Sequence, residues 1–404
     1  MVERREEQAG WLVVAVLFAV TLMVETIAWT QLTAYTPLFL RELHVPADEI
    51  PTWIAGFVSL GWVLALPLAP FWGVLADRYS RKLIIVRSAA IEAVIFAGWA
   101  FSTSPWMALV FICLNGFILG NTGVMLAVQA SITPAQRLAL GIGIVGAGSP
   151  AGRTLGPILG SALVHLFDVK GMLLIDAGLS AFIAVLLMVF LREGDRVRPA
   201  DVRVFSLLRG ALDEIVRNPV LWRLFLAMTV AQLGVWVALP YVPIYIARLA
   251  PMNPVTAVGV VLSLVGLGAA VASPLWGVGL QRFGYTLVLS AASTGTCVTL
   301  LAAGASHEIG LFASFLVLNS VFSTAILTAM MAVMAATVSA ERRGAVLGQI
   351  MFPFYVGGLV GPVLGALAFH AGQLVVFGLA GLLSLSPLIV LFTMRPAVPQ
   401  TQEA

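Results

Sequence analysis

Charged side chains are scarce in this sequence. Asp, Glu, Lys and Arg together make up 10% of the 404 residues, whereas 60% of the residues are hydrophobic. Soluble domains carry about 25% charged residues, so this chain has too little polar surface to face water on all sides. The mean hydropathy of +1.01 agrees with that conclusion. The composition therefore indicates an integral membrane protein whose surface lies mostly in lipid.

Cysteine and histidine are also rare, with two and four residues. Cys113 and Cys297 both lie in apolar stretches, which argues against a disulfide scaffold, and the scattered histidines form no metal-site pattern. The net charge is only +3 and there is no long basic run, so a nucleic-acid-binding surface is excluded. We expect no cofactor. A phosphate-binding G-x-x-x-x-G-K-[ST] loop is missing, which excludes an ATP-driven pump, and no nucleophile–base pair suggests an enzyme.

Long apolar runs dominate what remains. A helix that crosses a bilayer needs about 20 mostly apolar residues. We predict twelve such spans, at 11–40, 52–76, 83–103, 106–130, 138–165, 170–191, 221–247, 255–280, 285–304, 309–335, 345–370 and 373–394. The first run follows Arg4 and Arg5 but continues past the length of a signal peptide, so we expect a retained helix.

The basic residues predict the orientation of these spans. If both termini lie in the cytoplasm, seventeen Lys and Arg residues fall on that side, and only Arg41, Lys170 and Arg248 fall outside. This asymmetry follows the rule that cytoplasmic loops are enriched in basic residues. We therefore expect a multi-pass protein of the cell (inner) membrane with both termini inside.

The second six spans repeat the first six. The matching segments are YTP at 35–37 and YVP at 241–243, PFWGV at 70–74 and PLWGV at 274–278, LN at 114–115 and 318–319, and G-x-x-x-G-P-x-x-G at 152–160 and 357–365. Their order and nearly constant offset indicate a duplication. The predicted organisation is an N-terminal half at 1–191, a linker at 192–220 and a C-terminal half at 221–404. The linker is expected to form either a helix at the cytoplasmic interface or a solvated connection.

Two of these motifs resemble those of a known family. Residues 73–82, GVLADRYSRK, resemble the loop 2–3 signature of the major facilitator superfamily, with Ser80 at its second glycine. Residues 152–160, GRTLGPILG, are similar to its antiporter motif. The resemblance is to the twelve-span drug:proton antiporter group, although Ile112 stands where that group usually carries an arginine. It implies an all-α fold of two pseudo-symmetric six-helix halves around a central cavity.

The resemblance also implies roles for both motifs. Gly73, Asp77, Arg78 and Arg81 would form a latch that closes the halves on the cytoplasmic side. The alternative for the two arginines is that they are topology charges, which leaves Asp77 unexplained.

Spans 5 and 11 are predicted to act as hinges. Gly152, Gly156 and Pro157, with Gly361 and Pro362 in the repeat, combine small residues with a missing backbone donor. Tight static packing is the alternative, because glycines in membrane helices serve it equally well.

Four ionisable residues lie at membrane depth, all in the first half: Glu25, Glu92, Arg153 and Asp176. Such residues are functional candidates because they are costly there. Glu25 is about 21 Å and Arg153 about 22 Å from the inner face at 1.5 Å per residue. We predict an ion pair between them that couples transport to protons. For Glu92 and Asp176 we expect structural pairing.

A polar and aromatic set is predicted to line the substrate cavity: Trp29, Thr33, Asn115, Gln232, Trp236 and Asn319. The methionines Met330, Met331 and Met334 would add an adaptable lining, with core packing as the alternative. Aromatic rings and a buried carboxylate suit an apolar organic cation.

We therefore expect a monomeric secondary transporter in the lipid bilayer that exports hydrophobic, cationic small molecules in exchange for protons by alternating access. One alternative keeps the fold but makes the protein a facilitator, an uptake carrier or an exporter of an endogenous metabolite or lipid. Another is a membrane receptor or scaffold that transports nothing.

Overall fold

The structure is a computed structural model that describes residues 2–63, 65, 66, 68, 80–191, 215–337 and 351–393. Every regular element in these ranges is a helix, and eight helices are long and apolar enough to cross a membrane. Each of the predicted spans contains at least one described helical segment. The expected all-α membrane fold is confirmed. The predicted linker helix lies almost wholly outside the described residues.

The chain forms two compact units. The first consists of Met1–Val202 and Ala250–Leu267, and the second of Arg203–Leu249 and Gly268–Ala404. The elements of the N-terminal half are α1 Val2–Glu42, α2 Ile50–Val63, α4 Arg81–Ala100, α5 Pro105–Ile112, η1 Cys113–Phe117, α6 Asn121–Ile132, η2 Ala135–Arg137 and α7 Leu138–Phe190. Those that follow are α9 Pro219–Ala238, η3 Leu239–Tyr241, α10 Val242–Leu249, α11 Pro254–Ala305, α12 Ile309–Thr337, α14 Met351–Phe369, α15 Gln373–Leu383 and α16 Ser386–Thr393.

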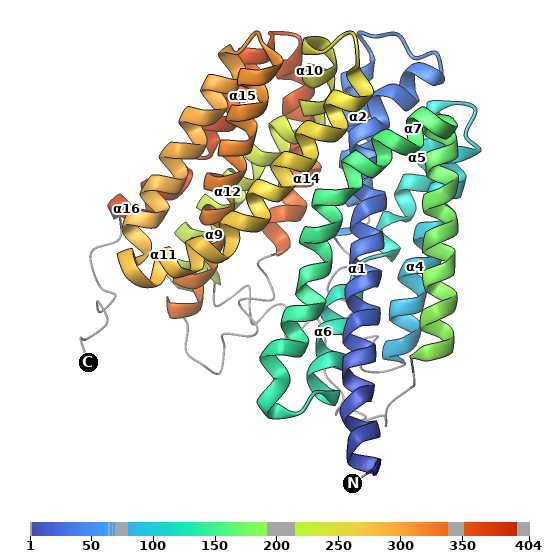
Figure 1. The fold of residues 1–404 in the computed structure, drawn as a ribbon. Coiled ribbons are helices and arrows are strands. Elements are labelled where there is room, and N and C mark those ends of the chain that lie inside the picture. The colour runs from blue at the N-terminus through green and yellow to red at the C-terminus, as the bar shows by residue number, and fades with distance from the viewer. Residues whose placement is uncertain are drawn as a thin grey trace. The chain divides into compact units, whose positions relative to one another are not determined.

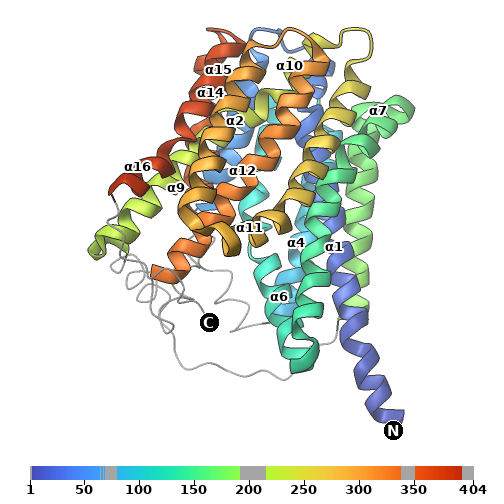
Figure 2. The same cartoon turned by 60° about the vertical axis from the view of Figure 1, so that its left-hand side comes forward.

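Helices α7 and α11 each contain one sharp reversal, so that each supplies two consecutive spans (Figures 1 and 2). The reversal in α7 is at Asp168, with φ 61°, and its carboxylate accepts a hydrogen bond of 2.8 Å from the N–H of Gly171. In α11 it is at Gly284, with φ 75°, where the missing Cβ removes the steric penalty. These two residues separate the fifth span from the sixth and the eighth from the ninth.

The first part of α7 packs on α1 through a stripe of glycines. Gly148, Gly152, Gly156 and Gly160 recur every four residues and so share one face of the helix. A Cβ added at Gly152 would lie 2.5 Å from the carbonyl oxygen of Met23 and 2.8 Å from the Cβ of Thr26. Close approach of the two backbones therefore requires glycine here, as the static-packing alternative expected. The hinge role of Gly152, Gly156 and Pro157 stays a prediction.

The same packing recurs in the second unit, between α14 and α9. A Cβ added at Gly361 would lie 2.5 Å from the Cβ of Trp236, and Gly357 and Gly365 face α9 in the same way. A tyrosine fastens each pair of helices. Tyr35 donates a hydrogen bond of 2.8 Å to the carbonyl of Pro157, and Tyr241 donates one to the carbonyl of Pro362. Repeated residues thus make repeated contacts.

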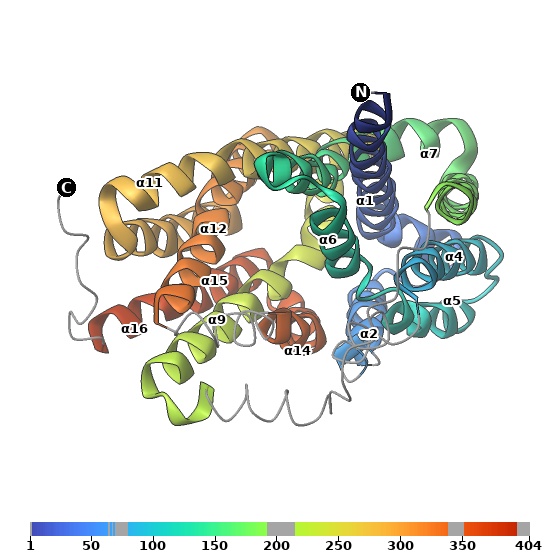
Figure 3. The same cartoon turned by 90° about the horizontal axis from the view of Figure 1, so that it is seen from below.

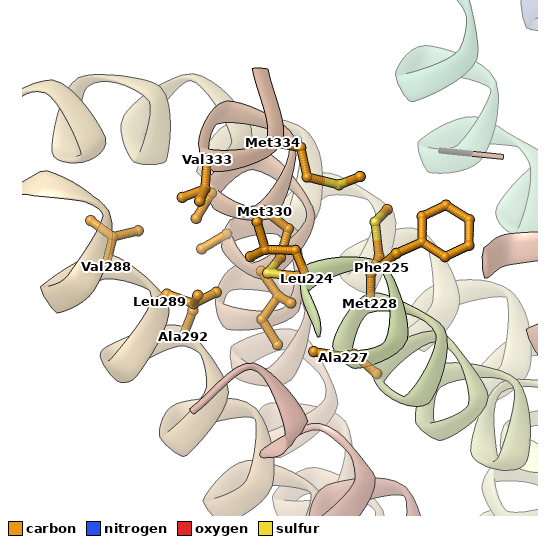
Figure 4. Packing of buried hydrophobic residues seen from close by; sticks show 14 of the residues in the cluster. Leu224, Phe225, Ala227, Met228, Val288, Leu289, Ala292, Met330, Val333 and Met334 are labelled. Carbon is orange, nitrogen blue, oxygen red and sulfur yellow. The ribbon is translucent and has the colours of Figure 1, made fainter. Parts of the chain in front are cut away.

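A cluster of buried apolar side chains from α9, α11 and α12 forms the core of the second unit (Figure 4). Met330 and Met334 are fully buried in it, against Leu224 and Met228. The expectation that these two methionines line a cavity is wrong, because their side chains fill the space between helices. Met331, one residue further round α12, is 38% exposed.

The glycine stripe predicts that replacing glycine by alanine lowers the stability of the protein at some positions of α7 and not at others. Gly152→Ala should destabilise the protein by about 1–3 kcal/mol, because the added methyl meets backbone that cannot yield without moving a helix. Gly146→Ala is the matched control on the same helix, since nothing lies within 4 Å of its Cβ position. It should be neutral or stabilise by up to about 1 kcal/mol through helix propensity. Thermal unfolding of the purified variants in detergent measures both, and equal effects would contradict the packing argument.

Candidate functional site

The residues that position a candidate site lie in the first unit, where α1, α4, α6 and the second part of α7 run beside one another (Figure 3). The predicted latch residues Gly73, Asp77 and Arg78 lie outside the described residues. Arg81 is the first residue of α4 and is exposed. Ser80, the departure from the family motif, is the N-cap of α4, and its hydroxyl accepts a hydrogen bond of 3.2 Å from the N–H of Leu83.

Glu25 lies midway along α1 and is half-buried. Its carboxylate accepts a hydrogen bond of 2.7 Å from the side-chain amide of Asn121, the first residue of α6. The amino end of a helix favours a nearby negative charge, because its first N–H groups have no partners within the helix. The contact therefore stabilises the ionised form of Glu25.

The predicted Glu25–Arg153 ion pair is not formed. Arg153 is exposed, and within the described part of the chain it has no ion-pair partner. The reason is its direction around the helix: Gly152 faces α1, and Arg153 is turned about 100° further. Its backbone carbonyl instead lies beside α11, where a Cβ added at Gly266 would approach it to 2.7 Å. The matching depth of the two residues stays a prediction, and depth does not fix the direction of a side chain.

Glu92 on α4 and Asp176 on α7 are both almost fully buried, at 3% and 1% exposure. The Ser180 hydroxyl donates a hydrogen bond of 3.1 Å to one oxygen of Glu92. The other oxygen of Glu92 and Oδ2 of Asp176 have no hydrogen-bond partner among the residues that the structure describes. Structural pairing was expected for both residues; Glu92 has this serine contact, and for Asp176 the expectation stays a prediction.

These three carboxyl groups form what we call the acidic cluster: Glu25, Glu92 and Asp176. Glu92 is within electrostatic reach of both other members, and the Trp29 indole lies beside it. In the described ranges, no Lys or Arg forms an ion pair with any of the three. An unpaired carboxylate in a low-dielectric interior costs several kcal/mol, and neighbouring like charges add to that cost. The arrangement is therefore suited to binding protons.

The predicted cavity residues of the first unit lie in different settings. The Trp29 ring is held at 5.5 Å from the Phe96 ring, beside the acidic cluster. The Thr33 hydroxyl bonds the carbonyl of Trp29 at 2.8 Å, within its own helix. The Asn115 amide donates a hydrogen bond of 3.0 Å to the carbonyl of Gly61 on α2. Of the three, only Trp29 adjoins the acidic cluster.

The predicted cavity residues of the second unit take part in helix packing. Gln232 and Trp236 on α9 face the glycines of α14. The Asn319 amide donates to the hydroxyl of Thr299 at 3.3 Å, between α12 and the second part of α11. Their part in a central cavity stays a prediction.

Sequence reasoning missed Asn121 and Ser180 as members of the site. Ser180 gave no signal, because a lone serine in a membrane helix commonly bonds its own backbone. For Asn121 a signal was present: Gly116 and Gly120 precede it within an apolar run, which lowers the expectation of one continuous helix.

Comparisons with known proteins agree with this architecture. Residues 14–253 and 225–404 match the model of the Major Facilitator Superfamily. The multi-drug resistance efflux pump PmrA of Streptococcus pneumoniae is 25% identical over 343 residues, which cover 84% of each chain. The multidrug resistance protein MdtG of Proteus mirabilis is 25% identical over 258 residues, covering 63% of this chain and 64% of MdtG.

Solved structures share the fold at lower identity. The nucleoside transporter NupG superposes with a TM-score of 0.77 at 15% identity, covering 95% of this chain and all of that one. A bacterial homologue of the human lysosomal transporter Spinster gives a TM-score of 0.75 at 15% identity over 95% of this chain and 94% of the other. The family match spans nearly the whole chain, and the fold is that of solved transporters. This membrane protein therefore belongs to the Major Facilitator Superfamily.

Proposed function

We propose that the protein exports hydrophobic organic cations in exchange for protons, with the acidic cluster as the coupling site. The observation that carries this proposal is a set of three membrane-embedded carboxyl groups without a basic partner among the described residues. The names of two relatives, a multi-drug resistance efflux pump and a multidrug resistance protein, support drugs as the exported compounds. Membership of a transporter family supports the coarser statement that the chain moves small molecules across a bilayer.

The proposed exchange follows from electrostatics. With no cation bound, protons neutralise the cluster, because burial and mutual repulsion disfavour several ionised carboxylates at once. A cationic substrate near Glu25 replaces a proton, since either one neutralises the carboxylate. Competition between the two at one group couples their movements in opposite directions across the membrane. Alternating access of the two halves then exposes Glu25 to each side in turn.

Glu25 is the member best placed for direct exchange. It is half-buried, whereas Glu92 and Asp176 are almost fully buried behind it in the packing of α4 and α7. Trp29 lies one helical turn from Glu25 and is also half-buried, so its ring can offer an aromatic face to a cation. Arg153 is exposed and unpaired within the described ranges, so the proposal assigns no coupling role to it.

Replacing Glu25 tests the coupling. Wild-type protein in proteoliposomes should concentrate a dye cation about tenfold for each pH unit imposed, per proton exchanged. Glu25→Gln should retain downhill exchange and lose this accumulation, because the neutral amide cannot carry the proton. Asp48→Asn is the control, since it neutralises an exposed carboxylate in the loop before α2. If Glu25→Gln accumulates the dye as strongly as the wild type does, Glu25 is not the coupling residue.

The same assay separates the alternative functions. A wild-type protein that equilibrates the dye but ignores the pH gradient is a facilitator, and the antiport proposal then fails. Failure to move any cation, anion or nucleoside tested would instead favour a receptor or scaffold.

Neutralising Glu92 tests the interaction within the acidic cluster. Glu92→Gln removes a negative neighbour of Glu25, so ionised Glu25 becomes easier to form. The midpoint of the pH profile of dye transport should therefore move to lower pH, by about one unit or less. Unfolding temperature should be unchanged or higher, because a buried unpartnered carboxylate is replaced by a neutral amide. An unmoved midpoint would mean that Glu92 holds its proton throughout the cycle.

A further inference from the structure

The fourth span is interrupted in its middle. It consists of α5, the short 3₁₀ helix η1 at Cys113–Phe117, a turn, and α6 from Asn121. Gly120 adopts φ 92°, a left-handed conformation that glycine allows. The corresponding span of the second unit, α12, is one unbroken helix over Ile309–Thr337. An interruption at membrane depth exposes backbone carbonyls that lipid cannot satisfy, so other protein groups must bond them.

Two consecutive residues of α4 supply those bonds. The Ser88 hydroxyl donates to the carbonyl of Ile118 at 2.6 Å, and Nη2 of Arg87 donates to the carbonyl of Leu119 at 2.7 Å. The acceptors are the two residues before Gly120. Ser88 is 1% exposed. An arginine and a serine from the neighbouring span thus hold the end of the interruption.

The chain leads directly from this contact to Glu25. Asn121 follows Gly120 and begins α6. Its Oδ1 accepts a hydrogen bond of 2.7 Å from the N–H of Thr122, which fixes the side-chain amide. That amide then donates to Glu25 at 2.7 Å. The residue whose carbonyl accepts from Ser88 and the residue whose amide donates to Glu25 are only three positions apart in the sequence.

We propose that Arg87 and Ser88 are positioning residues: they hold the interrupted span so that Asn121 and the amino end of α6 stabilise the ionised form of Glu25. This inference rests on the proposed function, in which Glu25 exchanges a proton. It assigns to α4 a task that no sequence motif marked.

The sign of the effect follows from the groups around Glu25. Asn121 from α6 and the helix end favour the charged carboxylate, whereas Glu92 from α4, itself next to Asp176 on α7, disfavours it. The described parts of α2, α5 and η1 contain no Asp, Glu, Lys, Arg or His. If the interrupted span loosens, Asn121 and the amino end of α6 no longer stabilise the ionised form of Glu25, whereas Glu92 still disfavours it. Glu25 should then bind its proton more tightly and titrate at higher pH.

The test measures titration of Glu25 directly, by infrared spectroscopy of the full-length protein in lipid. The carbonyl stretch of protonated Glu25 is the band that Glu25→Gln removes. Ser88→Ala and Arg87→Met should each raise the pH at which this band is half lost by about half a unit, which corresponds to part of the free energy of one hydrogen bond. Asn121→Ala should raise it at least as far, and Ser88→Ala should add nothing further in the Asn121→Ala background.

Ser102→Ala is the matched control. Ser102 is a fully buried serine just beyond α4, and its hydroxyl donates a hydrogen bond of 2.6 Å to the carbonyl of Gly98 near the end of that helix. It should leave the midpoint in place even if it lowers the unfolding temperature. Arg87→Lys should restore part of the wild-type midpoint, because the ammonium can still donate.

Two outcomes distinguish a failure of the positioning role of Arg87 and Ser88 from a failure of the proposed proton-coupled transport. A midpoint unmoved by Ser88→Ala and Arg87→Met, with pH-driven transport intact, overturns the positioning role and leaves the proposed function standing. Transport that ignores the pH gradient in the wild type overturns the proposed function, whereas the titration of Glu25 still decides the positioning role.

Discussion

The cost of leaving a polar group without a partner in lipid governs this structure. Water cannot satisfy a backbone or side-chain group at membrane depth, so each such group must find a protein partner or carry a proton. Arg87 and Ser88 bond the carbonyls freed by the interrupted fourth span, and Tyr35 fastens the carbonyl of Pro157. Within the described part of the chain, one carboxyl oxygen each of Glu92 and Asp176 has no hydrogen-bond partner. The proposed proton exchange takes place at the acidic cluster, where buried carboxyl groups lack such partners.

The glycines of the repeated motif, predicted to act as hinges, form close contacts between helices. The stripe along α7 and its repeat on α14 bring two pairs of helices into backbone contact, each closed by a tyrosine bonded to a proline carbonyl. Such contact holds the first span against the fifth and the seventh against the eleventh as paired units. It also turns Arg153 away from α1, which is why Glu25 has an amide partner and not a guanidinium.

The duplicated halves have diverged in chemistry while keeping their packing. The first unit contains the interrupted span and all of the acidic cluster, whereas the corresponding α12 is continuous and contributes methionines to an apolar core. Repeated glycines, prolines and tyrosines preserve the helix pairs in both units. The acidic cluster lies in the first of them, which concentrates the proposed proton chemistry there.

The sequence alone determined the membrane setting, the apolar spans, the duplication and the family, because hydropathy, repeat spacing and loop motifs are local properties of the chain. It also singled out Glu25 and Glu92 by their depth. Only the tertiary structure decided the partners of these residues. Depth follows from counting along a helix, whereas direction depends on which face packs against a neighbour. Asn121, Ser180, Arg87 and Ser88 acquired their contacts in that way, from helices far apart in the sequence.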